Sequence, residues 1–202
     1  MSVTKATFRK KCLKTLQTLS RHNRCYRDAK VVAKLLSHPR VKSAESILAF
    51  WPLDSEPDIR GALAALRSQN KKIYMPFMED DSFKMVPFRL PLTPKSFGIY
   101  EPGDTKLNIK KIDVAIVPAV GVDGEGRRIG FGKGMYDRFF ARLKERPYII
   151  FVQSKLCNTS KYICDEHDIT ADLLITPEAY YAAAKGTKND KRNTLRRWHS
   201  HT

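Results

Sequence analysis

Glycines and basic residues gather in one short stretch of the sequence. They alternate with other residues in the order Arg128, Gly130, Gly132, Lys133 and Gly134. Glycines lack a Cβ, so their backbone N–H groups can approach a bound group closely. A helical pattern follows the stretch, and the N-terminus of a helix adds partial positive charge. These residue types predict a phosphate-binding loop, in which Arg128 and Lys133 hold phosphate and offset the charge that develops during its transfer.

An acidic residue, Asp137, lies one turn into the predicted helix. It could hold a divalent metal, because magnesium prefers one or two carboxylates together with phosphate oxygens and water. The alternative is a first-turn acid that the helix dipole stabilises, and the two roles are compatible. The loop lacks the Ser or Thr that follows the lysine of a P-loop, and it lacks the full G-x-G-x-x-G fingerprint. From spacing alone, a glycine-rich turn with incidental basic residues therefore stays open.

The longer stretch from Val117 to Phe140 resembles the signature of the 5-formyltetrahydrofolate cyclo-ligase family, whose members are also called methenyltetrahydrofolate synthetases. That signature reads Pro-Gly-Leu-Ala-Phe-Asp and then Gly-Asn-Arg-Leu-Gly-Arg-Gly-Lys-Gly-Tyr-Tyr-Asp. Other segments of the chain match the family in the same order: Lys5 and Arg9, Leu53 to Glu56, Phe97 to Pro102, and Glu166 to Asp172. The resemblance covers residues 5 to 176.

The resemblance implies an ATP- and Mg²⁺-dependent ligase. Such an enzyme converts 5-formyltetrahydrofolate to 5,10-methenyltetrahydrofolate, ADP and phosphate through a phosphorylated formyl (iminium phosphate) intermediate. It implies catalytic roles for Lys133 and Arg128. The implied ATP contacts are Lys5, Arg9, Arg128, Gly130, Gly132, Lys133, Gly134 and Tyr136. The implied substrate contacts are Trp51, Glu56, Met135 and Tyr136, and the implied magnesium ligands are Asp137 and Asp172.

Two residues of the loop region depart from the family pattern. Met135 stands where the family has the first tyrosine of Tyr-Tyr-Asp, and Phe131 stands where a basic or polar residue is frequent. These changes keep open a divergent member that binds nucleotide without turning over folate.

The composition bears on whether the protein binds nucleic acid or spans a membrane. The 202 residues carry a net charge of +16, which could serve nonspecific nucleic-acid binding on an α/β scaffold or steer polyanionic substrates such as ATP and polyglutamylated folate. The basic residues do not alternate with aromatic ones as in nucleic-acid-binding motifs, so we expect no specific nucleic-acid partner. The sequence contains no run of about eighteen apolar residues, so we expect no segment that spans a membrane. We expect a monomer.

The cysteines and the N-terminal composition bear on the compartment. Cys12, Cys25, Cys157 and Cys164 show no paired spacing, which predicts reduced thiols and a cytoplasmic protein. The segment before Asp28 has no acidic residue and resembles a mitochondrial transit peptide. Because the segment includes Lys5 and Arg9, we interpret it as a retained helix.

The elements that position these residues follow from the periodicity of apolar residues. Helices are predicted over 4–19, 28–37, 58–69 and 134–144, and strands over 46–50, 72–75, 84–88, 113–117, 148–152 and 173–176. Pro76 is expected to end the second strand, and residues 89–108 to form a long loop. The alternation predicts a single α/β domain over residues 1–184, with a largely parallel central sheet between helices in a Rossmann-like three-layer arrangement. Residues 185–202 are predicted to be a basic, disordered tail.

Overall fold

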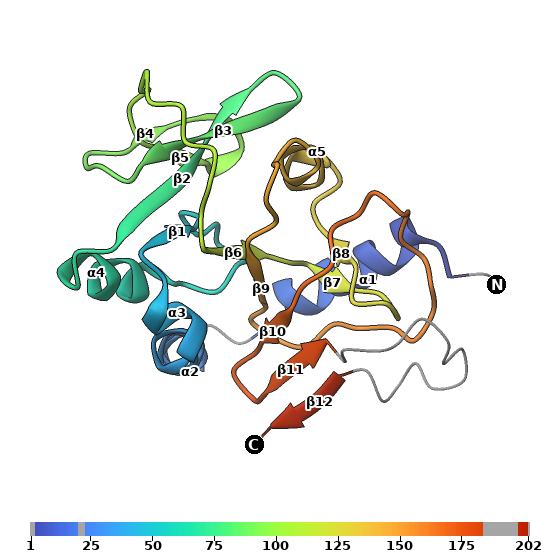
Figure 1. The fold of residues 1–202 in the computed structure, drawn as a ribbon. Coiled ribbons are helices and arrows are strands. Elements are labelled where there is room, and N and C mark those ends of the chain that lie inside the picture. Colours follow the sequence, from blue (N-terminus) through green and yellow to red (C-terminus); the bar gives the residue numbers. More distant parts are fainter. Residues whose placement is uncertain (1–2, 20–22, 184–197, 202) are drawn as a thin grey trace.

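The central feature of the computed structural model is one eight-stranded sheet with the strand order β12-β11-β10-β9-β6-β1-β2-β3 (Figure 1). The structure describes residues 3–19, 23–183 and 198–201. The inner strands run parallel, and they are β10 (Leu173–Ile175), β9 (Tyr148–Val152), β6 (Val114–Pro118), β1 (Ser46–Leu48) and β2 (Lys72–Glu79). The outer strands pair antiparallel, and they are β3 (Ser82–Pro87), β11 (Tyr180–Ala183) and β12 (Trp198–His201). The largely parallel sheet confirms the predicted fold class.

Helices cover both faces of this sheet (Figure 1). Successive side chains of a strand point to opposite faces. In β1, Ile47 accordingly joins one hydrophobic cluster and Leu48 joins the other. The first cluster is covered by α2 (Arg24–Ser37), α3 (Pro39–Ser43) and α4 (Arg60–Ser68), and the second is covered by α5 (Met135–Ala141). Strands buried on both faces need continuous apolar runs, which is why 114–117 reads Val-Ala-Ile-Val.

The N-terminal helix α1 (Lys5–Gln17) packs against a separate, smaller cluster. Thr4 caps it, because its side chain accepts a hydrogen bond from the backbone N–H of Thr7. Its buried residues Phe8 and Cys12 pack with Val120 and Ile129. These two residues belong to the region of a two-stranded ribbon, which consists of β7 (Gly121–Val122) and β8 (Arg128–Ile129): Val120 directly precedes β7, and Ile129 lies in β8. The basic face of α1 is thereby brought to the segment that follows β8.

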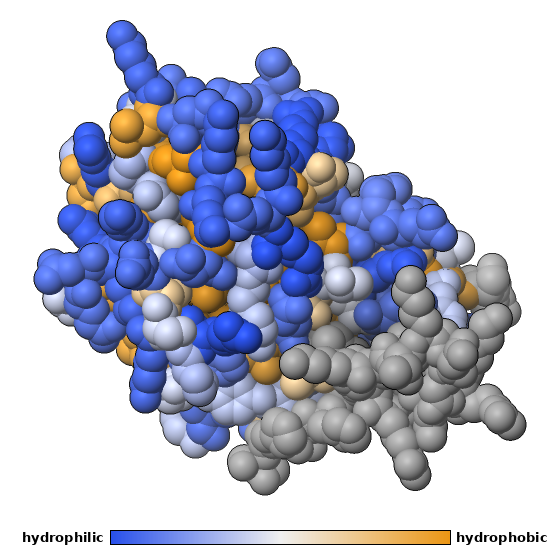
Figure 2. All heavy atoms as spheres, viewed as in Figure 1, coloured by the Kyte–Doolittle hydropathy of each residue, from blue (hydrophilic) through white to orange (hydrophobic). Residues whose placement is uncertain are grey.

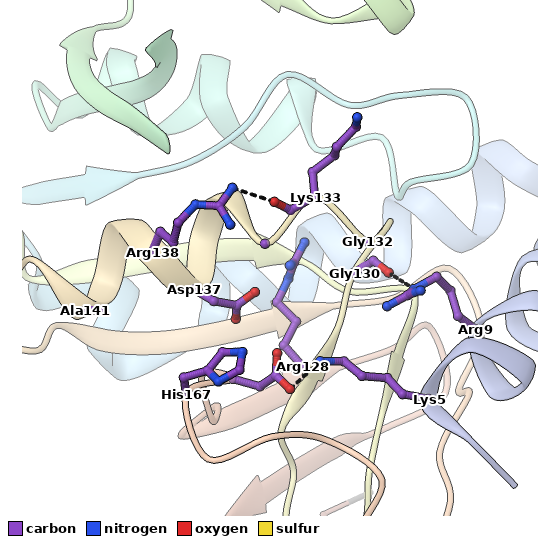
Figure 3. Close-up of a pocket in the computed structure, with 12 residues that line it drawn as sticks. Lys5, Arg9, Arg128, Gly130, Gly132, Lys133, Asp137, Arg138, Ala141 and His167 are labelled. Carbon is purple, nitrogen blue, oxygen red and sulfur yellow. Dashed lines mark hydrogen bonds and ion pairs between the residues drawn. The ribbon is translucent and has the colours of Figure 1, made fainter. Parts of the chain in front are cut away.

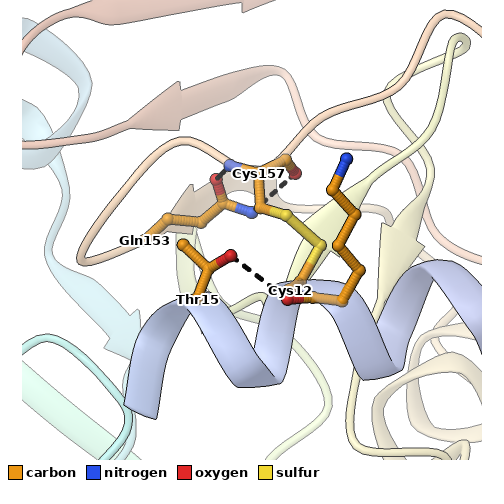
Figure 4. Close-up of a disulfide and its surroundings, with 5 residues drawn as sticks. Cys12, Thr15, Gln153 and Cys157 are labelled. Carbon is orange, nitrogen blue, oxygen red and sulfur yellow. Dashed lines mark hydrogen bonds between the residues drawn. A yellow bond between two sulfur atoms is a disulfide. The ribbon is translucent and has the colours of Figure 1, made fainter. Parts of the chain in front are cut away.

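A disulfide joins Cys12 in α1 to Cys157 in the loop after β9 (Figure 4). The prediction that all the cysteines are reduced is therefore wrong for this pair, whereas Cys25 and Cys164 are free. The two partners are 145 residues apart along the chain. They meet because Val122 in β7 donates to the carbonyl of Cys157 (3.0 Å), which brings the loop after β9 beside the ribbon on which α1 packs. The side chain of Gln153 accepts from the backbone N–H of Cys157 (3.1 Å) and fixes that loop.

Several predicted boundaries shift. Strand β2 continues through Pro76, which pairs with Met85 of β3. Its pairing with β1 ends at Tyr74, so no strand on that side needs the N–H that proline lacks. The predicted loop 89–108 contains the short ribbon of β4 (Thr93–Pro94) and β5 (Tyr100–Glu101), and helix α5 ends at Ala141 rather than at residue 144. Of the predicted disordered tail, residues 185–197 and 202 lie outside the described residues, whereas 198–201 form β12.

The hydrophilic character of the surface agrees with the high net charge of the chain. The face seen in Figure 2 carries mainly hydrophilic side chains with hydrophobic ones scattered among them. Among the described residues, no helix combines the length and the apolar character that crossing a bilayer requires.

Candidate active site

A pocket of about 340 Å³ opens where the loop after β8 runs into α5 (Figure 3). Its walls come from the first helix and from residues between 128 and 168. The lining residues are Lys5, Arg9, Arg128, Gly130, Gly132, Lys133, Gly134, Asp137, Arg138, Ala141, His167 and Asp168. Except for Tyr136, every ATP contact that the resemblance implies lies in this wall.

The glycines of the loop occupy positions that other residues would strain. Gly132 and Gly134 have φ angles of 106° and 63°, in the left-handed region that glycine adopts without a steric penalty. A Cβ on Gly130 would lie 2.3 Å from a terminal nitrogen of Arg128, whose side chain would have to move. Helix α5 has only seven residues, so full charges rather than the helix dipole dominate the electrostatics of the pocket.

Helix α1 contributes two cations to the pocket. The Nε of Arg9 donates to the carbonyl of Gly130 (2.8 Å), and Lys5 forms ion pairs with Asp168 and with Asp165 (3.3 Å). Burial opposes the charge on Lys5, but the hydrogen bond and charge of Asp168 outweigh burial and raise the lysine's pKa. Lys5 and Arg9 thus lie on one face of α1 and both line the pocket, as their spacing of four predicts.

Arg128 links the pocket to a buried acidic group. Its Nε donates to the carbonyl of Pro118 (2.9 Å), and its guanidinium carbon lies 4.8 Å from the centre of the Tyr136 ring. Glu56 accepts from the backbone N–H of Leu53 (2.8 Å) and is buried. Burial raises the pKa of Glu56 to about 7, although that hydrogen bond and the charge of Arg128 oppose the rise. The charges of Glu56 and Arg128 also act on the buried hydroxyl of Tyr136, whose pKa is raised chiefly by burial. The predicted phosphate and substrate residues therefore meet at Arg128.

The structure separates the two predicted metal ligands. Asp137 lines the pocket and accepts from the backbone N–H of Ile169 (3.2 Å). Asp172 is absent from the pocket wall and instead accepts from Arg146 (2.7 Å) and from the backbone N–H of Ile149 (2.7 Å), at the amino end of β10. The prediction that Asp172 joins Asp137 at a metal therefore stays a prediction, and of the two carboxylates only Asp137 lines the pocket in this structure.

A further carboxylate, that of Asp168, lies in the pocket wall. Asp168 is buried, and its carboxylate lies in a cluster with Asp165 and His167 in which the ligand atoms are within 4.8 Å of one another. Asp168 and Asp172 belong to the same short segment of family resemblance. Sequence order alone could not show which of the two faces the loop.

The remaining predicted substrate residues, Met135 and Trp51, are not part of the pocket wall. Met135 is half-buried, and its sulfur lies 3.6 Å from a terminal nitrogen of Arg138. Trp51 packs on the cluster under α2 and α4, with its ring 6.1 Å from that of Phe88 and 5.7 Å from the guanidinium carbon of Arg60.

A second, larger cleft has a volume of about 970 Å³ and is lined by the residues that directly precede Glu56 in the sequence. Leu53, Asp54 and Ser55 line it after β1, and Ser154 lines it after β9. The carboxyl ends of parallel strands are where open α/β sheets bind ligands. Arg24 and Cys25 of α2 and Tyr100 of β5 also line the cleft, and the sequence predicted a binding role for none of these three.

Comparison with known proteins gives one consistent result. The model of the 5-formyltetrahydrofolate cyclo-ligase family matches residues 1–177. The chain is 26% identical over 176 residues to 5-formyltetrahydrofolate cyclo-ligase of Mus musculus, covering 79% of this chain and 87% of the relative. It is 27% identical over 155 residues to that of Escherichia coli K12, covering 71% and 84%.

Solved structures agree. The NMR structure of Aquifex aeolicus 5,10-methenyltetrahydrofolate synthetase superposes with a TM-score of 0.77 at 28% identity and covers 94% of this chain and 97% of that one. The 5,10-methenyltetrahydrofolate synthetase of Mycoplasma pneumoniae, with a TM-score of 0.67 and 22% identity over 87% and 99% of the two chains, shares the fold. The family match, which spans strands β1 to β10, the glycine loop and the residues that line the pocket, shows that this chain belongs to the 5-formyltetrahydrofolate cyclo-ligase family of enzymes.

Proposed function

We propose that this protein converts 5-formyltetrahydrofolate and ATP to 5,10-methenyltetrahydrofolate, ADP and phosphate, with Mg²⁺ as cofactor. The observation that carries the proposal is the composition of the pocket wall in a chain of this family. Basic residues and carboxylates surround one glycine loop there: Lys5, Arg9, Arg128, Lys133, Arg138, Asp137 and Asp168. A cationic wall with two carboxylates suits a polyphosphate that binds together with a divalent metal.

Four of the basic residues, Lys5, Arg9, Arg128 and Lys133, would bind and neutralise the triphosphate of ATP. Hydrogen bonds to charged groups are shorter and stronger than neutral ones, and a low-dielectric wall strengthens them further. We assign Arg128 and Lys133 to the β- and γ-phosphates, where charge develops as the phosphoryl group is transferred. Lys5 and Arg9 would close the pocket from α1.

Two carboxylates of the wall fit a magnesium ion. Asp137 and Asp168 are both buried and supply the hard oxygen ligands that magnesium prefers. Lys5, which now pairs with Asp168, would have to share that carboxylate with the metal. A magnesium ion held by these carboxylates would supply Lewis-acid stabilisation of the charge on the phosphates.

The larger cleft supports binding of the folate. Its volume of about 970 Å³ lies at the upper end of the range for small-molecule sites. Glu56 would bind the folate from beside this cleft, and Arg128 joins it electrostatically to the phosphate pocket. Tyr136, Met135 and Trp51 are the further substrate contacts in this proposal. The indole of Trp51 could cover a pterin ring.

In the proposed reaction the protein positions two ligands and forms no covalent bond with either of them. The formyl oxygen attacks the γ-phosphorus, the bond to the β-phosphate oxygen breaks, and ADP leaves. N10 then attacks the activated formyl carbon and loses its proton, and phosphate departs as the ring closes. Holding the reacting atoms in line and neutralising the phosphates are the main contributions expected of such a site.

The proposal is tested by an assay of the methenyl product, followed by its ultraviolet absorbance. Wild-type protein is mixed with 5-formyltetrahydrofolate, ATP and magnesium, and each of the three is omitted in turn. Product that requires all three supports the proposal. No product from the complete mixture, or product without ATP, overturns it.

A further inference from the structure

Two arginines hold the backbone of the glycine loop at its two ends. The Nε of Arg9 donates to the carbonyl of Gly130 (2.8 Å), and a terminal nitrogen of Arg138 donates to the carbonyl of Lys133 (2.6 Å), as Figure 3 shows. Neither family resemblance nor residue spacing singled out Arg138. It is nevertheless part of the pocket wall.

Arg138 is itself anchored on the opposite side, in the turn between β2 and β3. Its Nε donates to the carbonyl of Asp81 and lies 3.6 Å from the carboxylate of the same residue. Asp81 also pairs with Arg142 (3.1 Å), one turn further along the chain from Arg138. Arg138 therefore bridges the turn of the hairpin and the glycine loop, whereas Arg142 contacts the turn and is absent from the pocket wall.

The bridge fixes the direction of a peptide group inside the loop. In a trans peptide the C=O of Lys133 and the N–H of Gly134 point in opposite directions, so holding the carbonyl also sets the N–H. Gly132 and Gly134 leave the loop with many alternative conformations, and selecting one of them at the moment of binding would reduce affinity. A guanidinium that bonds two backbone carbonyls selects the conformation before any ligand arrives.

We infer that Arg138 is a positioning residue for ATP: anchored on Asp81, it holds the Lys133 carbonyl and keeps the glycine loop in the shape that receives the triphosphate. The inference rests on the proposed function. The structure favours positioning over a direct contact with phosphate, since Arg138 directs two of its nitrogens to protein carbonyls.

The test compares three variants by calorimetric titration with ATP and magnesium in the absence of folate, and by steady-state kinetics. Arg138→Ala removes the bridge. Arg138→Lys keeps the charge, but its single terminal nitrogen cannot span the distance between the Asp81 and Lys133 carbonyls as the guanidinium does. Arg142→Ala is the matched control, because it removes a neighbouring arginine that pairs with the same Asp81. Thermal midpoints establish that each variant is folded.

Both changes at Arg138 are expected to weaken ATP binding on the order of tenfold, the loss of about one charge-assisted hydrogen bond. The same loss should appear in KM for ATP, while kcat changes less than about threefold, because a preformed loop affects ground and transition states alike. Arg142→Ala should bind ATP as the wild type does.

Four other results for the variants would overturn the inference. Wild-type affinity in Arg138→Lys would show that charge alone matters, and wild-type affinity in Arg138→Ala would show that the bridge has no role. An equal loss in Arg142→Ala would indicate general loosening of the hairpin, and a fall in kcat at unchanged KM would make Arg138 a direct ligand of the transition state. Wild-type protein that binds ATP without turnover refutes the proposed reaction but not this inference. Wild-type protein that does not bind ATP refutes both.

Discussion

Replacing Glu56 by glutamine probes the buried carboxyl that joins the two ligand sites. Glutamine keeps the shape of the side chain, and its amide oxygen can still accept from the backbone N–H of Leu53. What the change removes is the ability to ionise. In the wild type, burial raises the pKa of Glu56 from its ordinary value of 4.5 to about 7.

The magnitude follows from the difference between the folded and unfolded states. Because the folded state disfavours the charged form, the unfolded chain ionises first, and folding loses free energy as the pH rises from about 4.5 toward 7. One pKa unit corresponds to about 1.4 kcal/mol, so the full cost of the carboxylate is about 3 kcal/mol above pH 7 and about 1 kcal/mol at pH 5. Glu56→Gln should escape this cost at every pH. Its advantage in the free energy of unfolding should therefore grow by about 2 kcal/mol between pH 5 and pH 8.

Urea denaturation of both proteins at pH 5, 6, 7 and 8 measures this directly. Glu45→Gln is a suitable control, because Glu45 is exposed and its change should shift the curves equally at all four pH values. A difference between Glu56→Gln and wild type that stays constant with pH would refute the argument that Glu56 is desolvated. A difference that shrinks as the pH rises would mean that Arg128 stabilises the carboxylate by more than burial destabilises it.

Three further predictions concern the pocket and the disulfide. Lys133→Ala should abolish ATP-dependent formation of the methenyl product while the circular dichroism spectrum is unchanged; near-normal turnover would remove Lys133 from the catalytic site. Asp168→Asn should raise the magnesium concentration required for half-maximal activity, whereas Asp172→Asn should leave it unchanged, and the opposite order would restore the ligand assigned from sequence. Reducing the bond between Cys12 and Cys157, which lie 145 residues apart, should lower the free energy of unfolding by up to about 5 kcal/mol in urea. The variant Cys12→Ser should be insensitive to reductant, and a wild type that is equally insensitive would show that the bond does not contribute.

The sequence predicted the parts of the fold that local patterns determine. The apolar run of β9 gives the observed boundaries, and the alternation of strands and helices gives the parallel sheet. The end of β2 was predicted wrongly, because a proline ends a strand only where a neighbour needs its N–H. Whether β1 still lies beside Pro76 depends on the length of a different strand.

The same limit applies to the site. The glycines and the charges of Arg128 and Lys133 are close in sequence, so a motif can describe them. Asp168 and Asp81 act through positions that the tertiary fold brings to the loop, and no local spacing encodes that approach. The pairing of Cys12 with Cys157 was missed for the same reason, because it depends on which loops the sheet places side by side.

The way α1 is attached has a practical consequence for protein samples. Its apolar residues belong to the small cluster of Phe8 and Cys12 rather than to the two clusters that flank the sheet. A protease cut between α1 and α2 would therefore spare the sheet and its covering helices, and the disulfide would still hold the helix with Lys5 and Arg9 against the pocket. Only after reduction could that fragment dissociate. Preparations that elute identically from a sizing column under oxidising conditions would then differ in activity once a thiol is added, so the size of the protein should be measured with and without reductant.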